Sequence, residues 1–338
     1  MKRSFILLAF LFAFFTGVSS QDDFRVMFYN VENLFDIYDN PEKNDEDFLP
    51  EGFMRWTSWK YWNKLRNITK VITAVGEMNS PVLIGLCEVE NDSVLFDLTK
   101  RSPLRAQTYD YIISDSPDER GINVALLYQR HRFKLIDKKE YCITVNKNNK
   151  KPTRNILHAV GILINTDTLD VLICHFPSRS EGQRTTELAR IEAAGVLKHR
   201  TDSIFNLRSN ANIIIMGDFN DYPKDKSLSK ILNAKGKVDN TKLINLFYNN
   251  GAEIEYGTYK YQGNWGILDQ FIVSSNLINN GNTVKVKNKK ANIYYQDFLL
   301  EDDKTYYGKK PYRTSLGPRY NGGFSDHLPI FMDLILRD

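Results

Sequence analysis

Apolar residues along this chain gather in short runs, and several of these runs end at a polar or charged residue. Runs of this length, rich in Val, Ile, Leu and Phe, predict strands that are buried on both faces. Four runs with their polar neighbours are residues 24–29 with Asn30, 82–87 with Glu88, 169–174 with His175, and 213–216 with Asp218. Further strands are predicted over 123–128, 159–165, 270–273 and 330–336. The candidate functional residues therefore lie at strand ends.

Two segments have helical spacing instead. Apolar residues recur every three or four positions from Tyr61 to Val75, and less regularly over 186–199, where Leu188 and Ile191 mark the apolar face. Helices here would cover the faces of a layered sheet sandwich. Polar stretches over 36–52, 147–154 and 281–323 predict loops, and the last is long enough to indicate function or disorder.

The first twenty residues have the pattern of a secretory signal. Lys2 and Arg3 form a charged start, residues 5–15 are apolar, and residues 18–20 are small enough for cleavage. The apolar run is short for a membrane span, and no Cys follows it to carry a lipid. We expect a secreted or periplasmic protein without a transmembrane anchor, with one catalytic domain over 21–338.

Composition narrows the function classes only slightly. Loss of Lys2 and Arg3 leaves 43 basic residues against 41 acidic ones, a net charge of +2 that says little about partners. Cys87, Cys142 and Cys174 are irregularly spaced and are expected to be core thiols rather than a disulfide framework. The sequence has no CxxC or HExxH pattern, which argues against a structural zinc site and a zinc metalloprotease.

The strongest local motif is 216–221, Met-Gly-Asp-Phe-Asn-Asp. A strand that runs into a glycine turn would present Asp218 and Asn220 together at its end. The carboxylate can accept a proton from water, and the amide can hold that water without adding charge. An Asx turn, in which both side chains bond their own backbone, explains the same residues equally well.

A second motif, 325–329, places Asp326 and His327 just before the last predicted strand. A carboxylate can fix the tautomer of an imidazole and raise its pKa, so that it stabilises negative charge. The chain has only five histidines, and His175 and His327 are the two at strand ends. A structural histidine is the alternative for either of them, and His131, His158 and His199 are assigned surface or structural roles.

Oxygen donors follow the first two central strands. Asn30, Glu32 and Glu88 are ligands that suit a hard cation such as Mg²⁺, which takes one or two carboxylates together with water and substrate phosphate. Glu90 and Asp92 are expected to be solvated loop charges.

Taken together and in order, these motifs resemble those of the endonuclease/exonuclease/phosphatase superfamily, which has the deoxyribonuclease I-like fold. The resemblance covers nearly the whole mature chain. The matching stretches are 29–34, 85–90, 174–178, 217–220, 268–270 and 325–327. It implies a single-domain, four-layer α/β/β/α sandwich with one active site at the strand ends.

The resemblance also implies a metal site. Glu88 would be the principal ligand of Mg²⁺, or of Mn²⁺ or Ca²⁺ in its place. Asn30, Glu32 and Asp326 would bind the ion or its waters.

The same resemblance assigns the chemistry of the remaining residues. Asp218 would orient or deprotonate the attacking water, and Asn220 would position it. His327, supported by Asp269, would donate to the phosphoryl oxygen, and His175 would assist from the other side. The reaction implied is metal-assisted in-line displacement without a covalent intermediate.

Parts of the chain depart from the family pattern. Cys87 stands where many members carry Gln. The acidic partner that the deoxyribonuclease-like branch gives to His175 is unclear here; Glu119 is the candidate, and the neighbouring Arg120 is a candidate phosphate contact. A histidine at 175 also points away from the abasic-site repair enzymes.

Substrate contacts are harder to predict. Arg179 follows His175 closely and could bind phosphate in bidentate fashion. Residues 304–320 carry five cations, Arg313 among them, and four tyrosines, a pattern that suits single-stranded nucleic acid or a solvated loop. The aromatic cluster over 53–62 predicts packing at the start of a helix, or alternatively a lipid-binding surface.

We therefore expect a monomeric, metal-dependent phosphodiesterase, with nuclease activity on DNA or RNA as the leading hypothesis. A lipid-headgroup or small-molecule phosphoesterase, similar to sphingomyelinases or inositol phosphatases, is the alternative within the fold. A non-catalytic exported binding module is the alternative outside it.

Overall fold

The computed structural model describes residues 24–144, 152–180, 182–236, 241–249 and 255–337. The signal predicted over 1–20 lies outside this range, as do residues 147–151 of the second predicted loop. Among the described residues, no helix combines the length and hydropathy of a bilayer span.

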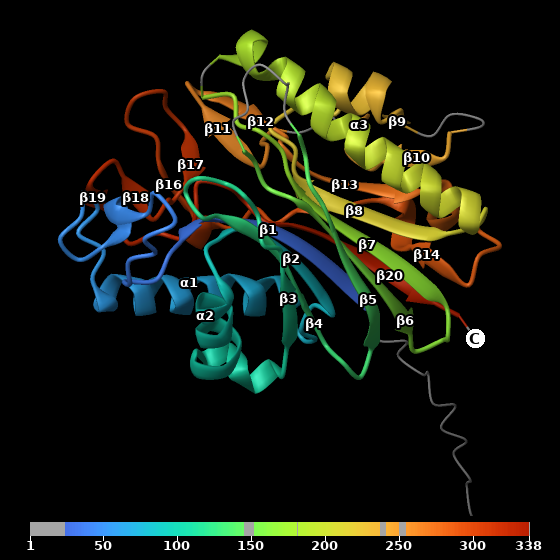
Figure 1. Cartoon of the computed structure of the whole chain (residues 1–338), viewed down its shortest axis with the longest axis horizontal. Coiled ribbons are helices and arrows are strands. Elements are labelled where there is room, and N and C mark those ends of the chain that lie inside the picture. The colour runs from blue at the N-terminus through green and yellow to red at the C-terminus, as the bar shows by residue number, and fades with distance from the viewer. Residues whose placement is uncertain (1–23, 145–151, 181, 237–240, 250–254, 338) are drawn as a thin grey trace, which may run out of the picture.

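Two large sheets lie face to face, with helices on their outer sides (Figure 1). The first sheet has the order β14-β20-β1-β2-β4-β3, with β15 also paired to β20. Its strands are β1 (Phe24–Leu34), β2 (Leu83–Val89), β3 (Asp110–Ile113), β4 (Asn123–Tyr128), β14 (Val284–Val286), β15 (Asn292–Ile293) and β20 (Ile330–Leu336). The second sheet has the order β5-β6-β7-β8-β13-β10-β9. Its strands are β5 (Phe133–Tyr141), β6 (Ile156–Leu163), β7 (Thr168–His175), β8 (Asn212–Asp218), β9 (Ala234–Lys235), β10 (Leu243–Asn245) and β13 (Asp269–Ser274).

Helices α1 (Ser58–Gly76) and α2 (Asp92–Phe96) cover the first sheet, and α3 (Gln183–Leu207) covers the second. Short 3-10 or π turns complete the helical content: η1 (Glu46–Phe48), η2 (Asp97–Arg101), η3 (Pro103–Gln107), η4 (Ser227–Ile231), η5 (Ser275–Ile278), η6 (Lys287–Lys289) and η7 (Asp297–Leu299). The expected four-layer α/β/β/α sandwich is confirmed.

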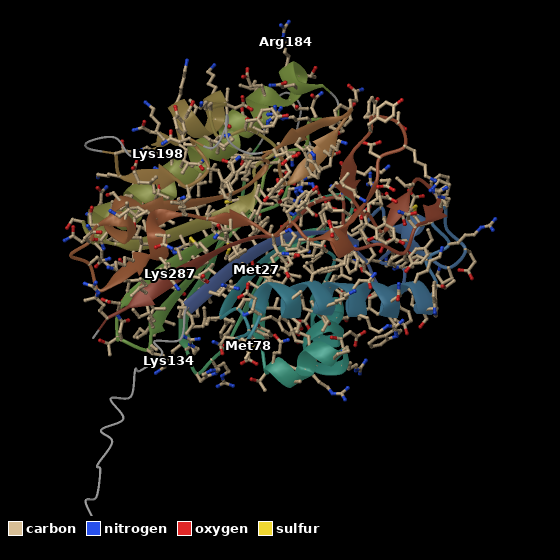
Figure 2. The ribbon with its side chains drawn as sticks, turned by 180° about the vertical axis from the view of Figure 1, so that it is seen from behind. Met27, Met78, Lys134, Arg184, Lys198 and Lys287 are labelled. Carbon is tan, nitrogen blue, oxygen red and sulfur yellow. The ribbon has the colours of Figure 1, made fainter. Side chains whose placement is uncertain are left out.

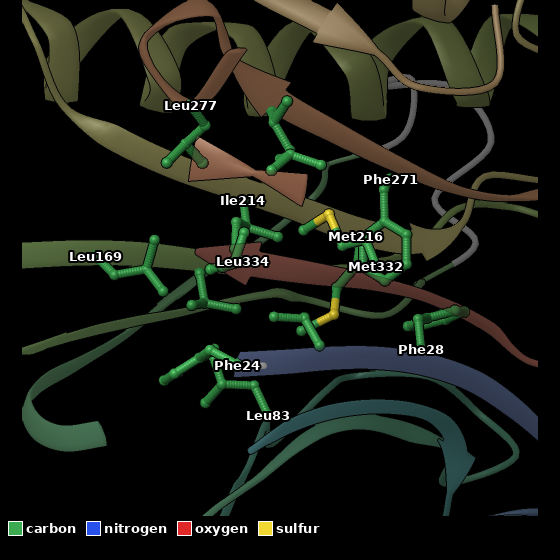
Figure 3. Packing of buried hydrophobic residues seen from close by; sticks show 14 of the residues in the cluster. Phe24, Phe28, Leu83, Leu169, Ile214, Met216, Phe271, Leu277, Met332 and Leu334 are labelled. Atoms are coloured by element: carbon green, nitrogen blue, oxygen red, sulfur yellow. The ribbon is translucent and has the colours of Figure 1, made fainter. Parts of the chain in front are cut away.

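The described residues form a core of three parts, and the central part fills the space between the sheets. Phe28 and Leu83 of the first sheet belong to the same buried cluster as Ile214 and Met216 of the second (Figure 3). A separate cluster, which includes Met27, packs α1 on the first sheet (Figure 2). On the surface, the side chains of Arg184 and Lys134 are exposed to solvent (Figure 2). Because β2, β4, β7 and β8 bury both faces almost completely, their sequences are largely apolar.

Helix α1 confirms its predicted spacing, but α3 corrects two details. It is longer than predicted, and Leu188 is exposed rather than part of the apolar face. Ala193, Ala194 and Leu197 face the sheet instead. Short alanine side chains make weak periodic signals, so the buried face was misplaced.

Strand β20 also differs from its prediction, because its burial alternates rather than covering both faces. Asp333 lies on the less buried side and pairs with Arg25 at 2.7 Å.

The segment predicted as one long loop contains ordered hairpins. In addition to β14 and β15, it forms β16 (Leu300–Asp302) with β17 (Lys309–Pro311) and β18 (Ser315–Leu316) with β19 (Arg319–Tyr320). These hairpins lie at the end of the sandwich where β1 ends, near a third hairpin of β11 (Tyr259–Tyr261) and β12 (Asn264–Gly266) (Figure 1). They build the walls around the strand ends.

Candidate active site

Three predicted catalytic residues form one row across the second sheet. His175 ends β7 and Asp218 ends β8, and the parallel register pairs the two directly. Asp269 begins β13 and pairs with Asp218 from the other side. Directly paired residues present their side chains on the same face of a sheet. The sheet register therefore brings together residues that lie far apart in the sequence, and all three are buried.

Gly217 allows β7 and β8 to approach closely beside this row. A Cβ at this position would lie 2.3 Å from the carbonyl oxygen of Cys174. The sequence predicted a turn at Gly217, and this prediction is wrong. Gly217 lies within β8, and the chain turns only after Asp218. The glycine is required by the neighbouring strand, not by a turn.

Asp218 satisfies both interpretations of its motif, because its two oxygens have different partners. Oδ1 accepts the backbone N–H of Asn220 at 2.9 Å, which is the Asx turn. Oδ2 accepts the side-chain amide of Asn30 at 3.2 Å and faces the site. Asn220 donates its own amide to the carbonyl oxygen of Phe176 at 3.1 Å, so its Oδ1 is the atom left for a water molecule.

The first sheet contributes Asn30 and Glu88. The ladder between β1 and β2 is regular up to Asn30 and Cys87 and irregular beyond them. Glu32, Asn33 and Glu88 in this region have φ of 51°, 53° and 62°, a conformation that residues with a side chain adopt uncommonly. Bulges of this kind redirect side chains at sheet ends. The Asn30 amide then spans Glu88 Oε1, at 3.3 Å, and Asp218, and so joins the two sheets.

His327 reaches the row from the segment before β20. The hydroxyl of Ser325 donates to the carbonyl oxygen of Asn30 at 2.7 Å and accepts the backbone N–H of His327 at 3.1 Å, which fixes this segment on β1. His327 Nδ1 lies 2.7 Å from Asp269 Oδ2, so Nε2 is turned into the site.

Asp218 Oδ2 is the centre of the arrangement. It lies 3.8 Å from His327 Nε2 and 3.7 Å from His175 Nε2. His175 Nε2 is in turn 4.0 Å from Glu88 Oε1. These separations are too long for direct hydrogen bonds. Asp218 Oδ2 is therefore flanked by both imidazoles without a direct hydrogen bond to either, and Glu88 lies next to His175.

Burial and charge shift the proton affinities of this group. Burial raises the pKa of Asp218 to about 7, and the nearby charge of Asp269 adds to the effect. Burial opposes the charged form of His327, but Asp269 and Asp218 outweigh it and hold its pKa well above the ordinary value. Burial, followed by the charge of Arg154, keeps the pKa of His175 well below the ordinary value. The two imidazoles therefore differ in proton affinity, since their surroundings favour the charged form of His327 and the neutral form of His175.

The oxygen donors at the open side of this group suit a divalent cation. Glu88 and Asp326 are its more accessible carboxylates, with side chains 17% and 21% exposed. Asp218, Asp269 and His327 also offer ligand atoms within 4.8 Å of one another. That second set is fully buried and already joined by the bond between His327 and Asp269, so the partly exposed carboxylates of Glu88 and Asp326 suit a hydrated Mg²⁺ better. Asn30 is placed as a support for Glu88, because its amide N–H faces Glu88 and its Oδ1 accepts the backbone N–H of Glu32 at 3.0 Å.

Glu32 is placed differently from the other predicted ligands. Its Oε1 accepts Arg313 Nε at 3.0 Å and its Oε2 accepts the backbone N–H of Thr314 at 2.7 Å. Burial, with repulsion from Asp326, raises its pKa. The carboxylate supports the segment that carries Arg313, and its role as a ligand stays a prediction.

The three predicted substrate arginines are placed unequally. Arg313 lies at the site, where its Nη2 donates to Asp326 at 3.1 Å. Arg179 is turned instead toward the carbonyl oxygen of Asn220 and the carboxylates of Asp221 and Asp225. Arg120 is half-exposed, with Nε 3.7 Å from Asp118. The structure brings only Arg313 directly beside the predicted metal ligands.

The predicted acidic partner of His175 is not found. Within the described residues, His175 Nδ1 has no hydrogen-bond partner. The carboxylate of Asp118 binds buried Arg154 at 3.2 Å, and Arg154 donates to the carbonyl oxygen of Phe176 at 2.7 Å. The ion pair of Asp118 and Arg154, rather than Glu119, therefore contacts the chain next to His175.

Several buried polar residues were missed or misjudged. Glu90, expected to be solvated, is buried and accepts the backbone N–H of Asp36 at 2.7 Å. Lys64 is fully buried and donates to Thr314 and to the carbonyl oxygen of Phe324. Its position on the apolar face of α1 was an available signal.

The remaining histidines and cysteines mostly match expectation. His158 is held between Tyr141 and Asp170, and His131 and His199 are exposed. All three cysteines are free thiols, but Cys142 is exposed rather than in the core.

The fold and this convergence of carboxylates and imidazoles are those of the deoxyribonuclease I-like class, whose members are phosphoester hydrolases. The family model described as "Endonuclease/Exonuclease/phosphatase family" matches residues 25–335, and the chain belongs to this family. A search of curated proteins returned no match.

Solved structures show the same fold at low sequence identity. A mannosyl-6-phosphatase from Bacteroides thetaiotaomicron is 16% identical with a TM-score of 0.57, and the match covers 92% of this chain and 99% of that one. The human Nocturnin catalytic domain with bound sulfate is 17% identical, with a TM-score of 0.55 and coverage of 93% and 94%. Danio rerio TDP2 complexed with single strand DNA product is 15% identical, with a TM-score of 0.54 and coverage of 93% and 99%.

Proposed function

We propose that this protein hydrolyses phosphoesters with the help of a divalent cation, by direct attack of water. The observation that carries the proposal is the position of Asp218 Oδ2 between His175 and His327, next to Glu88. A cation held by Glu88 and Asp326, with Asn30 alongside, would polarise a phosphoryl oxygen and stabilise its developing charge.

The protein's own groups supply the other requirements of the reaction. Asp218 accepts the proton of the attacking water, which Asn220 Oδ1 helps to orient. His327, held by Asp269, donates a hydrogen bond from Nε2 to a phosphoryl oxygen. As the water oxygen bonds to phosphorus, the ester P–O bond breaks, and the alcohol leaves with a proton from solvent that balances the one taken up by Asp218. His175 is neutral and donates a hydrogen bond from the opposite side. The donors are fixed before substrate arrives, which is the basis of electrostatic stabilisation in such sites.

The substrate class is the open choice, and we propose a small phosphoester ahead of nucleic acid. Cations of the segment 304–320 are largely engaged within the protein: Lys309 pairs with Asp302, Lys310 with Glu301, and Arg313 with Glu32 and Asp326. A surface that neutralises a strand of phosphates needs uncompensated cations. Solved structures with this fold include a mannosyl-6-phosphatase and a TDP2 complexed with single strand DNA product, so the fold is compatible with both substrate classes.

The test is hydrolysis by the full-length protein with Mg²⁺, Mn²⁺ or Ca²⁺, and with a chelator. Substrates are a sugar phosphate, an inositol phosphate, sphingomyelin vesicles, and single- and double-stranded DNA and RNA. Activity that requires the cation and falls to background in Asp218→Asn is the expected result. Asp302→Asn, a change at an exposed ion pair of β16, is the matched control and should retain activity. Cation-dependent turnover that Asp218→Asn leaves undiminished would overturn the mechanism, and absence of any turnover would favour a binding module.

We also propose that the protein acts outside the cytoplasm, on the strength of the signal predicted over 1–20. Mass spectrometry of the N-terminus after expression in a Gram-negative host tests this. A secreted or periplasmic product that begins near residue 21 is expected, and an uncleaved cytoplasmic chain would contradict it.

A further inference from the structure

A cavity of about 250 Å³ opens beside the catalytic centre. It lies between the loop that precedes α1 and the hairpin of β18 and β19, and Glu32 and Arg313 line it on the side of the active site. Asn33 links the two regions, because it lines the cavity and its backbone N–H donates to Glu88 Oε2 at 2.9 Å. A phosphoester bound at Glu88 would therefore place its alcohol portion in or near this cavity.

The loop wall of the cavity is held in place by packing and hydrogen bonds. Buried Trp56 donates its indole N–H to the carbonyl oxygen of Phe35 at 2.9 Å. Phe48 stacks on Phe35 with ring centroids 4.2 Å apart. The backbone N–H of Met54 donates to the carbonyl oxygen of Asp47 at 2.9 Å. The cavity is thus formed before a ligand binds, which lowers the ordering cost of binding.

The wall also presents apolar surface that the fold leaves uncovered. Phe53 lines the cavity and is 61% exposed, although nearby Trp56 is buried. Phe48 and Met54 extend this apolar side. Aromatic faces of this kind stack against flat rings, including the C–H faces of sugars.

The polar side of the cavity favours neutral hydroxyl groups over further phosphates. The guanidinium of Arg313 already contacts two carboxylates, Glu32 at 3.0 Å and Asp326 at 3.1 Å. Asp47 is a further acidic lining residue, and Asn33, Thr314 and Ser315 are polar residues of the lining. Both cations at this side are already engaged, Arg313 with Glu32 and Asp326 and buried Lys64 with Thr314, so a second phosphate would find no free cation among them, whereas hydroxyl groups could donate to the Asp47 carboxylate.

We propose that this cavity binds a neutral, hydroxyl-bearing ring, and that the preferred substrate is a sugar phosphate whose ring stacks on Phe53 while its phosphate lies at Glu88. The inference rests on the proposed phosphoesterase function and adds the substrate class to it. The size of the cavity suits one ring rather than a polynucleotide strand.

The experiment compares Phe53→Ala with the wild type, using the full-length protein and Mg²⁺. Hexose 6-phosphate, glycerol 3-phosphate, which has no ring, and a short DNA oligonucleotide are the substrates. Phe53→Ala should raise KM for the hexose phosphate about three- to tenfold, the loss expected for one ring contact, with kcat unchanged and no effect on glycerol 3-phosphate. Phe96→Ala removes an exposed phenylalanine on α2 and is the matched control, with no expected effect.

Binding of hexose 6-phosphate, followed by ligand-observed NMR with Mg²⁺ in the Asp218→Asn background, separates the two proposals. Turnover of the hexose phosphate with an unchanged KM in Phe53→Ala overturns the cavity assignment and leaves the phosphoesterase function standing. Binding that weakens in Phe53→Ala, in a protein that hydrolyses none of the substrates, supports the cavity and overturns the function. A preference for the oligonucleotide, with a KM that rises in Phe53→Ala, overturns the sugar class.

Discussion

His327 Nδ1 lies 2.7 Å from Asp269 Oδ2, in a contact between residues 58 positions apart. The contact exists because Asp269 opens β13 next to Asp218, and because Ser325 fixes the segment of His327 on β1. It turns Nε2 toward Asp218 and sets the imidazole as a proton donor at the centre of the site.

Replacement of His327 by Gln should lower kcat about 10²- to 10⁴-fold, the usual contribution of a positioned acid. Asp269→Asn should give a smaller loss, because the imidazole remains but its charge and orientation are less well supported. The double variant should be no worse than His327→Gln alone, since Asp269 acts through His327. Steady-state kinetics of the four proteins checks this. Additive losses would mean that Asp269 has a role of its own.

Glu88→Gln should increase the Mg²⁺ concentration required for half-maximal activity by at least tenfold, because a partly exposed carboxylate that Asn30 holds in place is lost. Titration of activity with Mg²⁺ provides the measurement, and isothermal calorimetry gives the affinity directly. An unchanged metal requirement would move the cation to the buried set of Asp218, Asp269 and His327.

Arg179→Gln should lower kcat and leave KM for the phosphoester nearly unchanged. Arg179 holds the turn after Asp218 through Asn220 and Asp221, so its loss disturbs the water-orienting residues rather than a substrate contact. A rise in KM at constant kcat would instead show that Arg179 binds phosphate, as its place in the sequence had indicated.

Lys64 should make stability depend on pH in the alkaline range. Burial lowers the pKa of Lys64 to about 8 from 10.5, so between these values the unfolded chain binds more protons than the folded one. The free energy of unfolding must then rise with pH over that window, by about 3 kcal/mol at this group. Urea unfolding at pH 7 to 10.5 gives the free energy of unfolding of the wild type and of Lys64→Met. The wild-type value minus the variant value should be constant below pH 8 and rise above it. A flat difference would contradict the buried, unfavourably charged lysine.

Gly217→Ala should destabilise the fold by roughly 1–3 kcal/mol, as overpacking does, because the added Cβ meets the Cys174 carbonyl at 2.3 Å. Gly195→Ala is the matched control: a Cβ on that helical glycine meets no atom within 4 Å and should be neutral or stabilising. Thermal unfolding of the two variants tests the pair. Equal melting temperatures would mean that the strands can separate without cost.

The sequence was sufficient for the parts of the molecule with a strong local signal. Strand β4 was predicted with both boundaries correct, and α1 was recognised from its apolar spacing. The site candidates at strand ends followed from the same pattern, because an apolar run stops where the chain leaves the core. Helix α3 was less clear, since Ala193 and Ala194 give little contrast between the buried and the exposed face.

What the sequence determined by itself was the family, the layered fold and the set of residues able to carry the chemistry, because each depends on residue type and order along the chain. Only the tertiary structure decided which of them act together. Strand register placed His175, Asp218 and Asp269 in one row, and bulges at Glu32 and Glu88 redirected two carboxylates that look alike in sequence. The tertiary structure also paired Arg179 with Asp221 and placed Phe53 at an open cavity. These outcomes depend on contacts between distant segments, which no local pattern of residues contains.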